Sequence, residues 1–351
     1  REARAAPLAA RVTGAAHMAT RPFFIVSAPR SGSTLLRLIL DAHPRLAVPP
    51  PGWLFDMVYP YLFSYGDLGQ PQNLLALAED ILQAPTVRKW PLELTPEALA
   101  RAAREPTFAG IYEALHVAYA GLEGKTRWGE KTPRNSFWMD EIHALFPDAQ
   151  FIHIVRDGRD QAIDISDSLL WPYSVYSGAS LWQRYVNAVR DSAARLPREA
   201  FHEIRYEDLC ASPEATIRRL CEFLGEAFDP SMLSPHETRS ARAWSGHPLH
   251  AKTAQPISTQ YCEMHRTRLS GRDVAALEGL IGGTLQRFGY SLSGSAAAIP
   301  SRVAGQLLES DTVTNPENVP YRRWHEERRK ERKARGVWTE TDRPSRLWGM
   351  N

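Results

Sequence analysis

One stretch of the chain decides the fold: Phe23-Phe24-Ile25-Val26-Ser27-Ala28-Pro29-Arg30-Ser31-Gly32-Ser33-Thr34-Leu35-Leu36-Arg37-Leu38-Ile39-Leu40. Its first four residues are apolar and predict a short buried strand, and the Leu and Ile residues at its end recur at helical spacing. Between them lies a tight turn rich in Ser, Pro and Gly. A strand, a tight turn and a helix in this order point several backbone N–H groups and the positive end of a helix dipole at one place. The stretch therefore predicts a loop that binds a phosphate.

The loop departs from the P-loop pattern G-x-x-x-x-G-K-[ST] at its charged position. Ser33 stands where the pattern has Lys, and Arg30 supplies positive charge from inside the loop instead. In motors and kinases that Lys acts with Mg²⁺ on the heavily charged β and γ phosphates. The strand comparable to the magnesium-binding one, 151–155, ends in Arg156 rather than in Asp. A metal-free loop suits a less charged group such as a sulfuryl group; the alternative is an ordinary serine-rich turn before a helix.

Residues 28–37 resemble the segment that binds the 5′-phosphosulfate of PAPS (3′-phosphoadenosine 5′-phosphosulfate) in the sulfotransferase family. They are most similar to the bacterial branch related to tyrosylprotein sulfotransferases, as is Asp41-Ala42-His43-Pro44 after the helix. The resemblance implies PAPS as the donor, PAP as the product and no metal. It assigns donor binding to five loop residues, of which the first also stabilises charge during transfer: Arg30, Ser31, Gly32, Ser33 and Thr34.

The resemblance covers about residues 20–292 and implies an α/β fold, a P-loop-like three-layer α/β/α sandwich with a central parallel sheet. Residues 1–17 are interpreted as a tag or upstream leader, with a transit peptide as the alternative. Residues 18–292 form the predicted sulfotransferase-like domain, with a helical insertion at about 70–125, and 293–351 form a charged, helical C-terminal extension. Charges of both signs at helical spacing in the extension indicate a solvated helix, or an arm that docks on a second subunit or an acidic carrier protein.

Composition narrows the class of protein. The chain has 351 residues, 43% of them hydrophobic and 23% charged, and its net charge of +2 argues against a dedicated nucleic-acid binder. Its three cysteines show neither metal-ligand spacing nor a disulfide framework, so a reducing cytoplasm is predicted. No apolar run approaches the roughly 18 residues that a membrane span needs. Composition therefore predicts neither a nucleic-acid nor a membrane partner, and the resemblance implies a small-molecule acceptor.

A second basic stretch is Arg127-Trp128-Gly129-Glu130-Lys131-Thr132-Pro133. Gly129 and Pro133 bound a predicted turn within this stretch. A Lys inside such a turn is poorly explained as a solvent-facing residue. The stretch resembles the family's lysine-containing turn. That resemblance assigns Lys131 to the bridging or leaving oxygen of the donor.

A third stretch places an Arg beside a helix N-terminus. A helix predicted at 136–145 leads into the strand 151–155. This strand is followed by Arg156-Asp157-Gly158-Arg159-Asp160 and then by another helix, so the turn predicts a second anion site. The resemblance assigns Arg156 to the 3′-phosphate of PAPS. It also places Tyr206 near the adenine, and it identifies 250–259 with the loop that closes over the nucleotide.

The predicted site lacks the family's base. In the tyrosylprotein-type branch a catalytic Glu falls at the position of Pro51, and Pro cannot accept a proton. Glu130 beside Lys131 and Asp56 shortly after Pro51 are the candidate substitutes, and His43 is a third. Glu130 is preferred because it belongs to a restricted turn beside the donor lysine; a salt-bridged surface Glu is the alternative interpretation.

A second departure concerns the 3′-phosphate. Eight residues after Arg156 the family has a Ser that binds this phosphate, and this chain has Asp164. A carboxylate there would repel the phosphate unless it were protonated or turned away. Ser168 shares a helix face with Asp164 and is a candidate replacement, and Arg266 is the candidate for a basic residue expected at about Met264. The 5′ half of the site is therefore predicted to be intact and the 3′ half to be weakened.

Two aromatic clusters are predicted to face the acceptor, with core packing as the alternative. One begins after the Pro-rich turn at 49–51 and the other lies at 171–176. The residues assigned to a small, largely apolar acceptor are Trp53, Phe55, Trp171, Tyr173 and Tyr176.

Three functions are compatible with the sequence. The first is a cytoplasmic PAPS-dependent sulfotransferase that moves a sulfuryl group in line to a hydroxyl of a small acceptor, such as a bacterial metabolite. The second is an enzyme of the same fold with another donor or reaction, which Pro51 and Asp164 would support. The third is a non-catalytic protein that binds a nucleotide or a partner.

Overall fold

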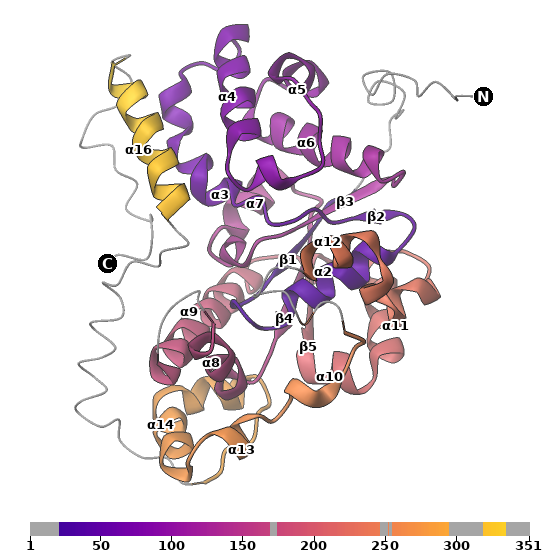
Figure 1. The fold of residues 1–351 in the computed structure, drawn as a ribbon, viewed down its shortest axis with the longest axis vertical. Coiled ribbons are helices and arrows are strands. Elements are labelled where there is room, and N and C mark those ends of the chain that lie inside the picture. The colour runs from indigo at the N-terminus through magenta and orange to yellow at the C-terminus, as the bar shows by residue number, and fades with distance from the viewer. Residues whose placement is uncertain (1–20, 169–173, 246–251, 253–254, 295–318, 335–351) are drawn as a thin grey trace.

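A computed structural model describes residues 21–168, 174–245, 252, 255–294 and 319–334. At its centre lies a sheet of five strands in the order β2-β3-β1-β4-β5, and every pairing is parallel. The strands are β1 Phe23–Val26, β2 Leu46–Ala47, β3 Arg127–Lys131, β4 Gln150–Val155 and β5 Phe201–Arg205. Figure 1 shows the sheet with helices on both sides. The prediction of an α/β fold with a central parallel sheet is confirmed.

Both faces of the sheet are covered, because the side chains of a strand alternate between its two faces. Phe24 and Val26 of β1 pack with apolar residues of α6 Phe108–Leu122 and α7 Met139–Leu145. Phe23 and Ile25 point the other way and pack with three helices: α2 Ser33–Ala42, α10 Tyr206–Ala211 and α11 Pro213–Leu224. Strands buried on both faces read as continuous apolar runs, which is why β1 could be predicted from four residues.

A third group of helices packs beside the carboxyl end of β4. It consists of α8 Gly158–Ser166, α9 Val175–Ala193 and α14 Gly271–Arg287. Trp182 of α9 is fully buried among them, and its indole N–H donates to the carbonyl of Arg156 at 3.0 Å. Gly158 is required here, because a Cβ at this position would lie 2.6 Å from the Trp182 ring. The group therefore fixes the backbone at the end of β4.

The register of the sheet brings the three predicted basic stretches together. Ile25 of β1 lies opposite Lys131 of β3, and Val26 lies opposite His153 of β4. Because the carboxyl ends of parallel strands meet at one edge, the loop after β1, the end of β3 and the turn after β4 lie side by side. Ligands of open parallel sheets bind at this edge.

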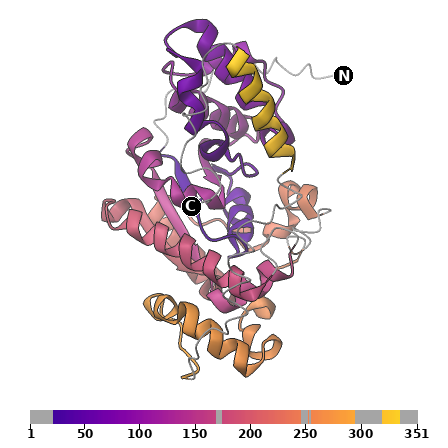
Figure 2. The same cartoon turned by 90° about the vertical axis from the view of Figure 1, so that its left-hand side faces the viewer.

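Helices also form the segment between β2 and β3. They include α4 Pro71–Gln83, α5 Pro96–Ala102 and α6. The C-terminal helix α16 Val319–Ala334 returns to this region and lies beside α4, as Figures 1 and 2 both show. An ion pair of 3.0 Å joins Arg328 of α16 to Asp80 of α4, and Trp324 is only 7% exposed. One face of the predicted charged helix is therefore packed against the domain.

The remaining segments are short. They are α3 Leu54–Met57, α12 Arg239–Ser245, α13 His265–Arg268, η1 Tyr59–Tyr65, η2 Val87–Lys89, η3 Pro133–Phe137, η4 Arg198–Ala200, η5 Pro230–Leu233, η6 Pro235–Glu237 and η8 Thr259–Tyr261, where η marks a 3₁₀ helix. Within the described ranges no helix is both long enough and apolar enough to cross a bilayer.

Two local predictions were wrong. Residues 127–131 form the strand β3, not a turn, because pairing with β1 on one side and β2 on the other overrides the turn propensity of Gly129. That glycine is needed for a different reason, since a Cβ there would lie 2.2 Å from the Phe23 ring. The helix predicted at 136–145 begins only at Met139 and follows η3.

Candidate active site

The loop between β1 and α2 has a backbone that few residues can adopt. Arg30 has φ of 65° and Gly32 has φ of 89°. A positive φ is unusual for Arg, and such residues concentrate at functional sites. At Gly32 a side chain is excluded twice, because a Cβ would also lie 2.3 Å from the ring of Tyr206. Tyr206, which begins α10, thus packs directly on the loop.

Two hydroxyls of the loop lack a partner. The side chains of Ser27 and Ser31 are fully buried, and neither Oγ has a hydrogen-bond partner among the described residues. Most buried polar atoms in folded proteins are hydrogen-bonded, so such a pair is a candidate for binding an external group. Ser27 directly follows β1 and Ser31 lies two residues before α2, whose N-terminus favours an anion. The loop therefore offers hydroxyl and backbone donors to an external anion.

Lys131 adds a cation to this loop from the end of β3. Its side chain is buried, and Nζ lies 3.4 Å from Oγ1 of Thr34 in α2. Burial lowers the pKa of Lys131 to about 7, and the nearby positive charges of Arg37 and Arg30 act in the same direction. An anion bound in the loop would relieve this repulsion and favour the protonated lysine.

The neighbouring carboxylate of Glu130 is held by two hydrogen bonds. Thr132 Oγ1 donates to it at 2.5 Å and the amide of Asn135 donates as well, and the backbone N–H of Gly52 lies near enough to lower its pKa. Burial raises the pKa of Glu130 to about 7, although these hydrogen bonds oppose the shift. Gly52 follows Pro51, so the Glu130 carboxylate lies beside the position where the resembled branch has its base.

The other two candidate bases are engaged in structural contacts. The Asp56 carboxylate accepts from Arg134 Nε at 2.6 Å and from the Trp138 indole at 2.9 Å. His43 Nε2 lies 2.9 Å from the carbonyl of Ala227, and its Nδ1 accepts the Arg45 N–H at 3.1 Å. Glu130 is also buried and hydrogen-bonded, but its partners are the neutral groups of Thr132 and Asn135, whereas Asp56 is paired with Arg134, so Glu130 stays the preferred candidate.

Arg156 connects the turn after β4 to the predicted phosphate loop, residues 27–32 between β1 and α2. Its Nη1 donates to the Arg30 carbonyl at 2.9 Å and to Asp164 Oδ2 at 2.6 Å. Its Nη2 donates to the carbonyl of Tyr261 at 2.7 Å, and the guanidinium lies 4.9 Å from the centre of the Tyr206 ring. The residues assigned to the two ends of the donor are thus in direct contact.

Asp164 is ionised and faces this cluster. Its Oδ1 accepts from Arg30 Nη2 at 3.1 Å and from Lys252 Nζ at 2.8 Å, in addition to the bond from Arg156. Burial alone would raise the pKa of Asp164, but the three cations hold it well below its usual range. The carboxylate is thus neither protonated nor turned away from the cationic group.

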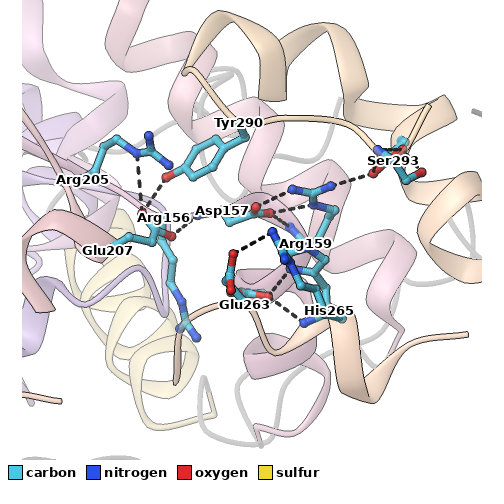
Figure 3. A network of polar contacts seen from close by, with 12 residues as sticks. Arg156, Asp157, Arg159, Arg205, Glu207, Glu263, His265, Tyr290 and Ser293 are labelled. Carbon is cyan, nitrogen blue, oxygen red and sulfur yellow. Dashed lines mark hydrogen bonds and ion pairs between the residues drawn. The ribbon is translucent and has the colours of Figure 1, made fainter. Parts of the chain in front are cut away.

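An ion-pair network behind Arg156 holds the turn in place (Figure 3). Arg159 pairs with Asp157 at 2.7 Å and with Glu278 of α14 at 2.6 Å. Glu207 of α10 accepts the Asp157 N–H at 2.9 Å and the Tyr290 hydroxyl at 3.0 Å. The network ties α8, α10 and α14 together and so holds the backbone that follows Arg156.

Two predicted residues of the 3′ half make other contacts. Ser168 Oγ donates to the carbonyl of Ile165 at 2.8 Å, one turn earlier in the chain. Arg266 is exposed and pairs with Glu263 at 2.7 Å. The cation that joins Asp164 is instead Lys252, which lies in the predicted closing loop at 250–259. Sequence reasoning identified that loop and missed this residue.

The predicted acceptor residues differ in their surroundings. Phe55 is fully buried, with its ring 5.5 Å from Phe108 and 5.3 Å from Tyr112, which supports the core interpretation. Trp53 is half-buried with φ of 58°, and its N–H donates to Thr132 Oγ1 at 3.3 Å. The Tyr176 hydroxyl donates to Asp273 at 2.7 Å. The other two lie outside the described residues: Trp171 and Tyr173.

Comparison with known sequences identifies the family of the chain. The sequence model described as "Sulfotransferase family" matches residues 22–230, which is more than half of the chain. The chain belongs to the sulfotransferase family.

Two relatives of this sulfotransferase share about a quarter of their aligned residues with it. Nodulation protein NoeE of Sinorhizobium fredii is 25% identical over 88% of this chain and 74% of its own length. Protein-tyrosine sulfotransferase A of Caenorhabditis elegans is 24% identical over 61% of this chain, and the match spans about half of that protein, 52%.

Two solved structures share its fold. The sulfotransferase domain of the Synechococcus PCC 7002 olefin synthase has a TM-score of 0.57 at 24% identity and covers 79% of this chain and 98% of its own. The sulfotransferase domain from the curacin biosynthetic pathway has a TM-score of 0.55 at 21% identity, and the match covers 77% of this chain and 98% of that domain. The predicted family, fold and enzyme class are confirmed. Among the described residues of this sulfotransferase, no group of His, Cys, Asp or Glu could hold a metal ion.

Proposed function

We propose that this sulfotransferase moves a sulfuryl group from an adenosine phosphosulfate, the class of donor to which PAPS belongs, to a hydroxyl of a small, largely apolar acceptor. One observation carries the proposal: the buried, unpartnered hydroxyls of Ser27 and Ser31 lie in a loop that Lys131 also approaches. Hydroxyls, backbone N–H groups and an ammonium in one place suit the oxygens of a phosphosulfate. The family's use of PAPS makes that nucleotide the first donor to test.

The chain's own groups would stabilise the leaving phosphate. In the transfer the acceptor oxygen forms a bond to sulfur while the bond between sulfur and the bridging phosphate oxygen breaks. Negative charge then builds on that phosphate. Lys131, Arg30 and the loop N–H groups would stabilise it, and donors already fixed by the fold do so without reorganisation.

Glu130 would remove the proton of the acceptor hydroxyl. A pKa of about 7 suits a general base near neutral pH, because the group is partly ionised there and still basic enough to accept a proton. The backbone N–H of Gly52 lies near enough to lower the pKa of this carboxylate, so Glu130 lies close to Pro51, where the resembled branch supplies its base.

The acceptor is proposed to be a metabolite that presents an aromatic or aliphatic alcohol. Half-buried Trp53, next to Glu130 through Thr132, would provide an apolar surface beside the proposed base. The two structural neighbours belong to an olefin synthase and to the curacin biosynthetic pathway, which is in keeping with a metabolite acceptor. Action in the cytoplasm, a second subunit and a carrier protein docked on the C-terminal extension stay predictions.

The test is a transfer assay on the full chain. Purified protein is mixed with ³⁵S-labelled PAPS or adenosine 5′-phosphosulfate and a panel of phenols and alcohols, and labelled acceptor is separated and counted. We expect transfer by the wild type, a loss of about 100-fold or more in Lys131→Ala, and no change in Lys89→Ala, which alters an exposed lysine. Absence of transfer from either donor, together with no binding of either nucleotide product by calorimetry, would overturn the proposal. Binding without transfer would favour a non-catalytic nucleotide-binding protein.

A further inference from the structure

Three cations from separate parts of the chain meet on one carboxylate. Arg30 comes from the phosphate loop, Arg156 from the end of β4 and Lys252 from the loop predicted to close over the nucleotide. All three reach Asp164 within 3.1 Å. Asp164 is 9% exposed and Arg156 is 2% exposed at their side chains, so little water screens the strongest of these pairs.

The terminal nitrogens of Arg156 are engaged by the chain, while its buried Nε lacks a partner among the described residues. Both terminal nitrogens donate to groups of the protein: the carbonyls of Arg30 and Tyr261 and the carboxylate of Asp164. The Tyr206 ring covers the guanidinium. A phosphate that approached Arg156 would have to displace Asp164 or lie against it, and two anions at contact distance in a buried site repel strongly.

The 5′ side of the proposed donor site differs from the Arg156 side in the partners that the chain supplies. At the 5′ side the chain leaves the Ser27 and Ser31 hydroxyls without partners, whereas at the Arg156 side it supplies an anion of its own. The chain thus supplies its own anion, Asp164, to a terminal nitrogen of Arg156 and leaves Nε unpartnered, whereas it supplies no partner to the two loop hydroxyls.

From this asymmetry we propose that Asp164 sets donor specificity by taking the place of a nucleotide 3′-phosphate. The preferred donor is then an adenosine 5′-phosphosulfate with a free 3′-hydroxyl rather than PAPS. The inference rests on the proposed function, because it requires that the nucleotide lie between the phosphate loop and Arg156. A neutral 3′-hydroxyl can accept or donate a hydrogen bond beside Asp164 and pays no charge repulsion.

The test compares two nucleotide products by calorimetry on the full chain. The ligands are AMP and adenosine 3′,5′-bisphosphate, which differ only in the 3′-phosphate. The variants are Asp164→Ser and, as a matched control, Asp167→Ser, which alters an exposed carboxylate paired with Arg268 one turn along. We expect the wild type to bind AMP at least as tightly as the bisphosphate. Asp164→Ser should tighten bisphosphate binding about tenfold or more and leave AMP within about threefold, and Asp167→Ser should change neither.

The outcomes distinguish a failure of the specificity inference from a failure of the proposed function. Wild-type binding of the bisphosphate tenfold tighter than AMP, with no gain in Asp164→Ser, would overturn the specificity inference and leave the proposed function standing. Failure of every variant to bind either nucleotide would overturn both. Should Asp164→Ser melt at a much lower temperature than the wild type, Asp164→Asn removes the charge at constant shape. Transfer rates of the wild type with the two labelled donors then give an independent comparison, in which faster transfer from PAPS would contradict the inference.

Discussion

Lys131 Nζ lies 3.4 Å from Thr34 Oγ1, and this contact joins the end of β3 to the first turn of α2. It places the ammonium against the loop whose buried hydroxyls lack partners. The same strand carries Glu130 immediately before it, so the proposed cation and the proposed base are adjacent residues whose side chains alternate along β3. The two side chains therefore leave β3 on opposite faces of the sheet, Glu130 in register with Phe24 and Lys131 in register with Ile25.

The pH dependence of transfer should be bell-shaped with a maximum near pH 7. Below pH 7 the rate should rise with pH, because Glu130 must be ionised to accept a proton and burial raises its pKa to about 7. Above pH 7 it should fall, because Lys131 must carry its proton and burial lowers its pKa to about 7. The measurement is kcat/KM between pH 5.5 and 9. In Lys131→Arg the falling limb should disappear, because Arg stays protonated over this range. A flat wild-type profile would contradict these roles.

Two carboxylate variants should separate catalysis from stability. Glu130→Gln should lower the transfer rate about 100- to 10,000-fold, the usual contribution of a general base. Asp56→Asn should leave the rate of the folded protein within a few-fold but cost about 3 kcal/mol of stability, because Arg134 would remain buried without its 2.6 Å partner. Rates and thermal unfolding would be measured on both. The reverse pattern, with activity lost in Asp56→Asn and retained in Glu130→Gln, would identify Asp56 as the base.

Gly32→Ala should disable the loop. The substitution must adopt φ of 89° and place its Cβ 2.3 Å from the Tyr206 ring. Gly124→Ala is a matched control, since Gly124 has φ of 68° with no atom within 4 Å of the added Cβ. The control should cost about 1 to 2 kcal/mol for backbone strain alone. Gly32→Ala should cost about 1 to 3 kcal/mol more and weaken nucleotide binding, as chemical unfolding and calorimetry would measure. Equal stabilities of the two variants would show that the contact with Tyr206 is unimportant.

The helix α16 should be held by its packed face. Trp324 is 7% exposed and belongs to the core cluster that includes the insertion helices, whereas the neighbouring Arg323 is exposed. Trp324→Ala should therefore release the helix, and proteolytic cleavage within 319–334 should become at least about fivefold faster, because cleavage follows local opening. Arg323→Ala should cleave at the wild-type rate. If both variants resisted the protease equally, the Trp324 contact would not be what holds α16.

Local patterns predicted the fold where the signal is contained in neighbouring residues. The run 23–40 holds its own strand, turn and helix, and the strand at 151–155 is an unbroken apolar run. The turn prediction for residues 127–131 was wrong because β3 owes its conformation to strands far along the chain, above all β1. Turn propensity is local, and it loses to pairing in the middle of a sheet.

The site was predicted as a set of residues and not as a set of contacts. Arg30 and Arg156 are 126 residues apart in the chain, and their contact depends on the register of β1 and β4. Asp164 could be noticed as a departure from the family, but its role depends on Lys252, 88 residues away. Only the fold shows that Asp56 is occupied by Arg134 while Glu130 lies beside Pro51.

The phosphate loop itself can be tested most directly by removing its two unpartnered hydroxyls. Replacing a buried hydroxyl that has no partner should be neutral or stabilising in the ligand-free protein. The double variant Ser27→Ala and Ser31→Ala should therefore unfold at the wild-type temperature or above it. Calorimetry should then show AMP binding weakened at least about tenfold, since two hydrogen bonds to the phosphate are lost. Unchanged AMP affinity in a folded double variant would contradict the claim that this loop binds the donor.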